Sequence, residues 1–410
     1  MGAEEKHYYF VVAMLKGVGG MQRYVLAKAR WLSDNGWTVH FLYGIDGQQI
    51  LDFSDFDCIH FVELMCRPST VPTCKREELL RGAISSARYS SETIVESSAC
   101  ILALWGELLA SRLQCRHLIF SLEEKLPRMS KSEAEFFRTK MDRGEFAGCY
   151  AGYLNKLFPH LTIEQCADKV LAASQQNPIV DDLIEYGTLP SAACSMLCFT
   201  RLEKTFVKPM LDSLIDYCFK HFEESFSLVF IGDADEKQLH YEIQHYADSV
   251  PNLSITILGY MTRIPRSLIQ RFEIGIGTAG CAWQMSAEGL KVIAYATDED
   301  ECIGVLRYDI PRICTLKECR AMQFENVLDD LRFSDKYRKR RYEDPDIVTG
   351  YRDFLDFLDK ASPSQDWVST NTLACPIAKR IESLIIQISH RYPTNLVRSL
   401  KHLTAFAKRG

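Results

Sequence analysis

The sequence predicts an α/β protein with two doubly wound domains, and three observations lead to this prediction. Apolar, strand-like runs alternate with amphipathic, helix-like runs along most of the chain, several strands end on glycine, and the pattern breaks near residue 190. A chain of 410 residues of which 47% are hydrophobic is long enough for two domains. Alternation of strands and helices favours parallel sheets.

The first domain begins with a strand over residues 7–14, a glycine turn and a helix over residues 24–35. Gly19 and Gly20 lie where that helix begins. The exposed backbone N–H groups and the positive end of the helix dipole make such a turn a binding site for an anion. The alternative interpretation is that the two glycines only permit a tight turn.

The rest of the first domain continues the alternation. Strands are predicted at residues 39–43, 58–64, 93–96 and 117–122, and helices at residues 99–113 and 130–146. Ligands of doubly wound sheets bind beyond the carboxyl ends of the strands. Four carboxylates near predicted strand ends therefore predict a polar crevice, although each alone is more often a helix cap or a solvated residue: Glu63, Glu96, Glu123 and Glu124. Within that crevice, Glu123 and Glu124 are the candidate catalytic residues.

A second series of strands and helices follows residues 175–195, where Asn177-Pro178, Gly187, Leu189-Pro190 and Ser191 break the pattern. Its predicted strands are at residues 194–199, 227–231, 253–258, 273–277 and 292–295. Its predicted helices are at residues 208–222, 236–246, 264–272 and 282–289. We therefore expect domains over residues 1–190 and 191–375, followed by a helical segment over residues 376–410.

Composition narrows the class of protein. The net charge of −6 argues against a dedicated nucleic-acid binder. The 15 cysteines show no CxxC pairs, which favours free thiols in a reducing cytosol over a disulfide framework or a zinc site. No apolar run approaches the roughly 20 residues that span a bilayer. We expect a cytoplasmic protein without a bound metal.

The run Gly19-Gly20-Met21-Gln22-Arg23 resembles the N-terminal signature of family 4 glycosyltransferases, which have the GT-B fold. In that family a Gly-Gly pair, an acidic or amide residue and an Arg begin the first helix. Gln22 stands where Glu is usual. The resemblance implies two Rossmann-like domains that face each other across a cleft, with the acceptor held by the first domain and a nucleotide sugar by the second.

The second domain resembles the donor domain of the same family. Arg201, with Lys204 or Lys208, matches the cations that hold the donor diphosphate in the family, and the spacing leaves the choice of lysine open. Such cations suit a leaving group that gains negative charge as the glycosidic bond breaks. The resemblance also places Tyr260, after the predicted strand at residues 253–258, beside the nucleotide base.

Residues 275–293 resemble the family's glycine turn and donor-binding helix. Thr278, Ala279 and Gly280 would offer backbone N–H groups to phosphate. Gln284 stands where a ribose-binding Glu is usual, so the two-glutamate pattern of the family is absent. An amide can still hydrogen-bond a ribose hydroxyl. Glu288, one helical turn later, completes the predicted donor-binding set.

The resemblance implies a retaining transferase that needs no metal and moves a sugar from a UDP- or GDP-type donor to a glycan or lipid-linked acceptor, typically in bacterial surface polysaccharide synthesis. Two alternatives remain open. The missing glutamates suit a non-catalytic scaffold for a partner transferase. Gly275-x-Gly277-x-x-Gly280, with acidic residues at 298–300, suits an NAD-dependent oxidoreductase, although this segment comes late in its domain.

The C-terminal part is predicted to be helical. An amphipathic helix over residues 377–391 is expected to cross back to the first domain, as in GT-B enzymes. Residues 391–410 carry five Lys or Arg residues and no acid, with leucines on a helical stripe. This segment is predicted either to lie on an anionic membrane surface or to pack on its own protein.

Overall fold

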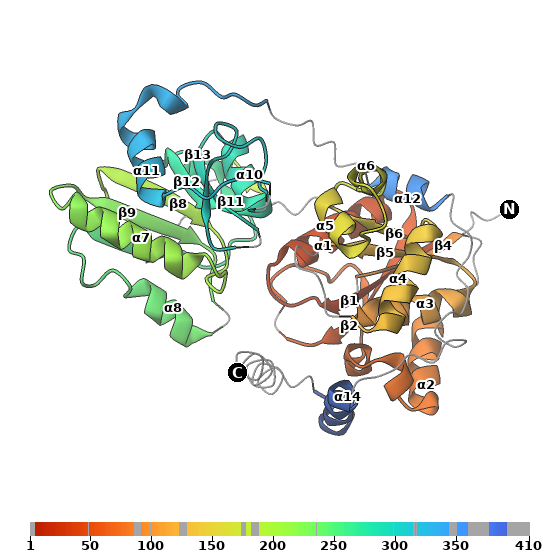
Figure 1. Cartoon of the computed structure of the whole chain (residues 1–410). Helices are drawn as coiled ribbons and strands as arrows, with labels where there is room; N and C mark the ends of the chain where they lie inside the picture. Colours follow the sequence, from red (N-terminus) through yellow and green to blue (C-terminus); the bar gives the residue numbers. More distant parts are fainter. Residues whose placement is uncertain are drawn as a thin grey trace. The chain divides into compact units, whose positions relative to one another are not determined.

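The computed structural model describes residues 5–391, except residues 48, 86–91, 99, 123–128, 174–177, 182–187, 235, 298, 315, 317, 344–350 and 360–376. The chain divides into two compact units (Figure 1). The first unit combines Met1–Ser174 with Val348–Gly410, and the second is Gln175–Ile347.

The first unit is built on a parallel sheet of six described strands in the order β3-β2-β1-β4-β5-β6. These strands are β1 (Lys6–Met14), β2 (Trp37–Ile45), β3 (Asp57–His60), β4 (Glu92–Ser97), β5 (Arg116–Ser121) and β6 (Phe146–Gly148). The chain order reverses between β1 and β4. A reversal of this kind opens a crevice at the carboxyl edge of the sheet.

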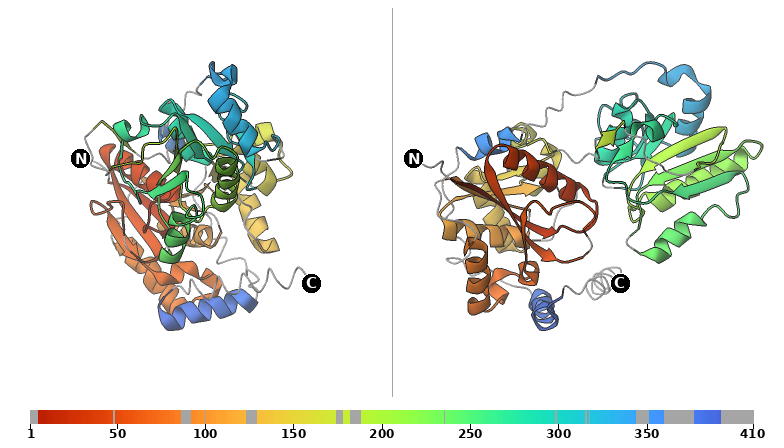
Figure 2. Two further views of the ribbon diagram at one scale, coloured as in Figure 1. Left: turned by 90° about the vertical axis from the view of Figure 1, so that its left-hand side faces the viewer. Right: turned by 180° about the vertical axis from the view of Figure 1, so that it is seen from behind.

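Helices cover both faces of this sheet, which explains why its strands are continuously apolar (Figures 1 and 2). Along β1, Tyr8 and Phe10 pack with α1, whereas Tyr9 and Val11 pack with α3. The helices described in residues 5–173 are α1 (Gly20–Asp34), α2 (Thr73–Ser85), α3 (Ile101–Leu113), α4 (Lys131–Asp142), α5 (Ala151–Leu157) and α6 (Ile163–Ala167), with 3-10 helices η1 (Val62–Met65) and η2 (Pro68–Thr70).

Two later helices return to the first unit. α12 (Arg352–Leu358) buries Phe354 and Leu358 against Tyr24 and Phe120, and α14 (Ile377–Ser389) buries Ile386 beside η1 and η2. The sequence analysis placed residues 351–359 in the second domain. Their apolar side chains complete the core on the α1 face of the first sheet instead.

The second unit has a sheet of six described strands in the order β10-β9-β8-β12-β13-β14, with only β14 antiparallel to its neighbour. They are β8 (Cys194–Phe199), β9 (Phe226–Ile231), β10 (Leu253–Ile257), β12 (Ile274–Gly277), β13 (Lys291–Tyr295) and β14 (Cys302–Val305). The chain order reverses between β8 and β12. A short pair, β7 (Ile179–Val180) with β11 (Ile264–Pro265), lies outside this sheet.

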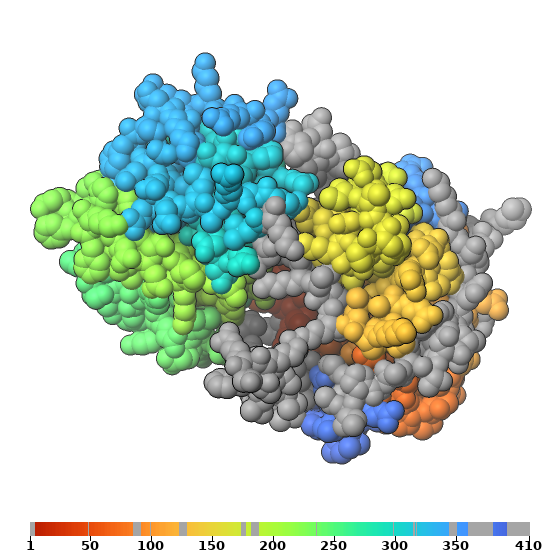
Figure 3. All heavy atoms as spheres, viewed as in Figure 1, coloured from red at the N-terminus to blue at the C-terminus, as the bar shows by residue number. Residues whose placement is uncertain are grey.

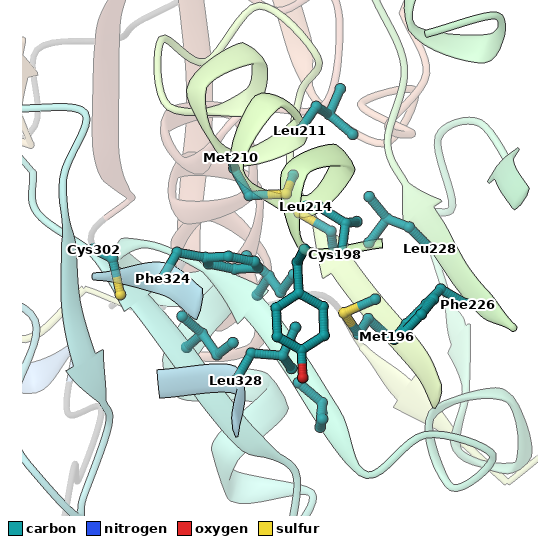
Figure 4. Packing of buried hydrophobic residues seen from close by; sticks show 14 of the residues in the cluster. Met196, Cys198, Met210, Leu211, Leu214, Phe226, Leu228, Cys302, Phe324 and Leu328 are labelled. Atoms are coloured by element: carbon teal, nitrogen blue, oxygen red, sulfur yellow. The ribbon is translucent and has the colours of Figure 1, made fainter. Parts of the chain in front are cut away.

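One face of the second sheet packs on α7 and α11, and Figure 4 shows the side chains of this core, among them Met196, Met210 and Phe324. The described helices of this unit are α7 (Val207–Lys220), α8 (Lys237–Gln244), α9 (Arg266–Ile269), α10 (Ala279–Ala287) and α11 (Phe324–Phe333), with 3-10 helix η3 (Asp335–Tyr337). The α/β class with doubly wound parallel sheets is therefore confirmed.

Several predicted boundaries differ from the structure because turns interrupt apolar runs. The helix predicted over residues 130–146 ends at Asp142, and Gly144 at φ 73° turns the chain into β6. The strand predicted over residues 58–64 ends at His60 and continues as η1. A short strand and a single helical turn replace the helix predicted over residues 264–272.

Candidate functional site

The candidate site lies at the carboxyl edge of the second sheet, where the strand order reverses. Ile276 of β12 pairs with Cys198 of β8, so the loop that begins at Thr200 and the turn at Thr278 leave neighbouring strand ends. Ligands of doubly wound sheets bind at such reversals. The geometry thus brings together the segments that carry Arg201 and the Thr278-Ala279-Gly280 turn.

The loop after β8 offers two cations. Arg201 is exposed and Lys204 is half-buried. Neither side chain makes a hydrogen bond or ion pair within the part of the chain that the structure describes. Lys208, in the first turn of α7, pairs with Glu242 at 3.3 Å, and both side chains are about half exposed. Arg201 and Lys204 are therefore the cations available to an anionic ligand.

A glycine fixes the path of this loop. Gly232, after β9, has φ 146°, and a Cβ built on it would lie 1.8 Å from the carbonyl oxygen of Thr200. The Leu202 N–H donates to the carbonyl of Asp233 at 3.1 Å. The loop that carries Arg201 is thus packed directly on the neighbouring strand end, and only glycine permits that approach.

The start of α10 has no side-chain cap. The Thr278 hydroxyl donates to the carbonyl of Tyr295 at 2.9 Å instead of capping the helix, and the first turn contains no acidic residue. Ala279 has φ 49°, the left-handed region, which costs about 1–2 kcal/mol for a residue with a Cβ. Backbone strain of this kind is characteristic of ligand-binding turns, and the uncapped N–H groups suit an anion.

Two other predicted donor-binding residues lie beyond the first turn of α10. The side chain of Gln284 is buried within the unit, with only 3% of the residue exposed, and it has contacts of its own there. Glu288 follows the last turn of α10, about 15 Å along the helix axis from Thr278. It forms an ion pair with Arg266, which also pairs with Asp181.

Tyr260 lies at the same edge, after β10, and donates its hydroxyl hydrogen to the carbonyl of Asp233 at 3.1 Å. The Asp233 carboxylate lies 2.6 Å from Nδ1 of His240, and both side chains are partly exposed. The sequence analysis did not identify this pair. An acid two residues after the apolar strand β9 is the signal that points to it.

The glycines of the GxGxxG segment also have a packing role. A Cβ at Gly275 or at Gly277 would lie 3.0 Å from the Met285 side chain. Both glycines therefore let α10 lie close against β12. This role does not require a dinucleotide.

The equivalent edge of the first unit carries the glycine turn before α1. The Gly19 N–H donates to Oε1 of Gln22 at 3.1 Å, and Nε2 of Gln22 donates to the carbonyl of Met14 at 3.3 Å. Gln22 thus holds the turn closed with a neutral amide. Gly20 is the first residue of α1, whose first turn has no acidic residue.

The four-carboxylate crevice predicted for the first unit is wrong for Glu96. This side chain points into the core beneath α1, where it accepts hydrogen bonds from Tyr8 at 2.5 Å, Tyr24 at 2.8 Å and Lys28 at 2.5 Å. Glu63 pairs with Lys75 at 3.4 Å. The candidate catalytic residues Glu123 and Glu124 lie outside the described residues.

The buried Lys28–Glu96 pair is a polar centre that the sequence analysis missed. Burial lowers the pKa of Lys28 to about 8, although the neighbouring Glu96 carboxylate acts to raise it. The Lys28 ammonium also lies 3.6 Å from the centre of the Phe354 ring, a cation–π contact. Its position on the same helical face as Tyr24 and Leu32 is the signal that could have shown its burial.

A second buried network joins Ser97, His117 and Glu107. His117 lies 2.8 Å from the Ser97 hydroxyl and 3.0 Å from the Glu107 carboxylate, and Lys140 pairs with Glu107. Burial, with the nearby Lys140 charge, lowers the pKa of His117 to about 4. The order Ser-His-Glu matches a hydrolytic triad, but Ser97 is 1% exposed and the other two are 0% exposed. Without access for a substrate, this network stabilises the fold.

Solved structures share this architecture, which is the GT-B fold of glycosyltransferases. A glycosyltransferase from Rickettsia africae ESF-5 is 16% identical, with 71% of this chain and 79% of that chain covered and a TM-score of 0.51. The apo form of the lipopolysaccharide outer core galactosyltransferase WaaB is 11% identical, with 86% and 99% covered and a TM-score of 0.50. At these identities the similarity establishes the fold alone.

No protein-family model and no curated protein matches the sequence. Among the described residues, no helix has both the length and the apolarity needed to cross a bilayer.

Proposed function

We propose that the protein is a glycosyltransferase that moves a sugar from a nucleotide-diphosphate sugar to a hydroxyl group. One observation carries this proposal. The loop with the two cations Arg201 and Lys204 follows β8, and the uncapped start of α10 follows the adjacent strand β12. A diphosphate has the charge and the acceptor oxygens that guanidinium, ammonium and backbone N–H groups bind.

The same groups would assist the reaction. As the bond from the sugar to the diphosphate breaks, negative charge grows on the departing phosphate oxygen. Arg201 and Lys204 would stabilise that charge, and the α10 dipole would add to their effect. Tyr260 would lie beside the base. Gln284 contributes to this proposal only if its buried amide becomes accessible when the donor binds.

The finer parts of the proposal come from the resemblance to family 4. They are retention of anomeric configuration, catalysis without a bound metal, a UDP- or GDP-type donor and a glycan or lipid-linked acceptor of a bacterial surface polysaccharide. Glu123 and Glu124 remain the proposed catalytic residues. We place the protein in the cytoplasm, on the inner face of the membrane, with residues 391–410 as a proposed membrane contact.

Calorimetric titration of UDP, GDP and ADP tests the donor site. We expect one nucleotide to bind, and Arg201→Ala to weaken it by about 10- to 100-fold, the value of one charged hydrogen bond. Lys204→Ala should have a smaller effect in the same direction. Lys208→Ala is the matched control, because this lysine is one turn away and already paired with Glu242. It should change the affinity by less than about threefold.

Three outcomes would contradict parts of this proposal. If Lys208→Ala and Arg201→Ala weaken binding equally, the assignment of the cations is wrong. If NAD binds and no nucleoside diphosphate does, the oxidoreductase alternative replaces it. If none of these ligands binds, the scaffold alternative is favoured. The burial of Gln284 is consistent with that alternative.

A further inference from the structure

The helix α14 packs on the first unit through a mixed, largely polar face. The Thr70 hydroxyl donates to the Ser383 hydroxyl at 2.8 Å, and Nε2 of Gln387 donates to the Thr70 carbonyl at 2.9 Å. Ile386 is fully buried, and Glu382 is 8% exposed. These contacts hold α14 against η1 and η2, where Figures 1 and 3 show it in blue at the lower edge of the first unit.

The opposite face of α14 is apolar and exposed. Ile381 is 51% exposed, Leu384 57% and Ile388 72%. At about 100° per residue, these three side chains and Ile385 fall within one arc of about 100°. A surface helix normally turns such an arc toward the protein core. α14 does the reverse, so its apolar arc lacks a partner among the described residues.

Within residues 380–391, the exposed charged side chains all have one sign. Arg380 and Arg391 are exposed at its two ends, and the one acid of residues 377–391, Glu382, lies on the buried face. The sequence that follows, residues 392–410, adds four Lys or Arg residues and no acid. A partner for this surface must therefore supply an apolar layer and negative charge together.

We propose that the outward face of α14 binds the surface of an anionic lipid bilayer. The isoleucines and the leucine would enter the boundary between headgroups and acyl chains, while Arg380 and Arg391 contact lipid phosphates. A second copy of α14, or residues 392–410 folded back on it, would oppose cations to cations. The inference adds the outward face of α14 to the membrane contact proposed for residues 391–410. It does not depend on the transfer reaction, since vesicle binding needs no donor.

Co-sedimentation of the full-length protein with vesicles tests this surface. We compare phosphatidylcholine vesicles with vesicles that also contain phosphatidylglycerol. We expect binding to the anionic vesicles only, weakened by added salt. The double variant Ile381→Ser/Ile388→Ser should bind at least about tenfold more weakly, because two apolar side chains no longer leave water.

The double variant Phe219→Ser/Phe222→Ser is the matched control, because these residues are 57% and 64% exposed on the second unit. It should bind vesicles like the wild type. Equal thermal midpoints and unchanged nucleotide affinity exclude misfolding in both variants, so failure of the donor-site proposal and failure of this one are distinguishable.

Other results would overturn the proposal. If the wild-type protein does not co-sediment with anionic vesicles, the arc does not bind lipid and has another partner, for example residues 392–410. Equal binding by both double variants shows that α14 is not the contact. A dimer in light scattering that Ile381→Ser/Ile388→Ser dissociates shows that a second copy covers the arc.

Discussion

The two units reverse their strand order at equivalent places, next to β1 in the first and next to β8 in the second, but they distribute their charges differently. The first unit buries ion pairs beneath its helices, Lys28–Glu96 on one face and Lys140–Glu107, with His117 beside it, on the other. The second leaves Arg201 and Lys204 at the edge of its sheet, beside the uncapped start of α10.

This difference shows that one topology can use its charged side chains either to stabilise packing or to bind a ligand. Charges that are paired in a dry core stabilise a particular packing but cannot reach a ligand. Charges left unpaired in water add little to stability and are free to bind an anion. Substitutions in the two units should therefore separate into effects on folding and effects on binding.

The largest effect on folding is expected from Glu96→Gln. The change leaves Lys28 buried without a countercharge, which costs about 3–5 kcal/mol of unfolding free energy. Urea denaturation of the purified protein measures it. Adding Lys28→Met to the same chain should recover most of the loss. A single-variant loss below about 1 kcal/mol would show that the buried pair is not what distinguishes the first unit.

Gly232→Ala should break the edge of the second unit. A Cβ there would lie 1.8 Å from the Thr200 carbonyl, so the backbone must move, at a cost of about 3 kcal/mol, and nucleotide affinity should fall with it. Gly289→Ala is the control, since Gly289 also has a positive φ, 98°, but open space around its Cβ position. It should cost about 1 kcal/mol and leave binding intact. Equal losses in the two variants would contradict the close approach.

The pH dependence of stability sharpens the comparison for the first unit. His117 has an ordinary pKa of 6.5 when unfolded and about 4 when folded, so the unfolded chain binds more protons between these values. Stability should therefore fall as pH falls, by about 1.5 kcal/mol between pH 6.5 and 5. His117→Gln should remove this decrease in denaturation curves recorded across that range. An unchanged decrease would assign it to other groups.

The smallest effect is expected from Ala279→Gly. Glycine removes the left-handed strain of Ala279 but adds freedom to the unfolded chain, which leaves a gain of about 0.5 kcal/mol. Thermal unfolding checks the gain, and nucleotide titration should show an affinity within about threefold of the wild type. A loss of stability would mean that the backbone at Ala279 is not strained.

The sequence predicted most strands of both sheets because strands buried on two faces are continuous apolar runs, as residues 7–14 are in β1 (Lys6–Met14). It missed the short edge strands β6 and β14. It did not predict where α12 packs. Phe354 and Leu358 suit either core, and helical periodicity identifies an apolar face without identifying the sheet that covers it.

For the candidate site, the sequence predicted which segments come together, but not which face of each element meets its neighbour. Arg201 and Thr278 follow strands directly, so their segments come to the carboxyl edge in any parallel sheet. The burial of Glu96 and the outward apolar arc of α14 depend on which face of an element meets its neighbour. Strand alternation and helical period alone do not fix that choice.

The return of α12 to the first unit sets an order for synthesis. A ribosome makes a chain from the N-terminal toward the C-terminal side, so residues 188–343 emerge before Phe354, which contacts Lys28 in the core of the first unit. The second unit can therefore be complete while the first still lacks two of its helices, α12 and α14. During synthesis, the first unit therefore begins to emerge before the second but is completed after it.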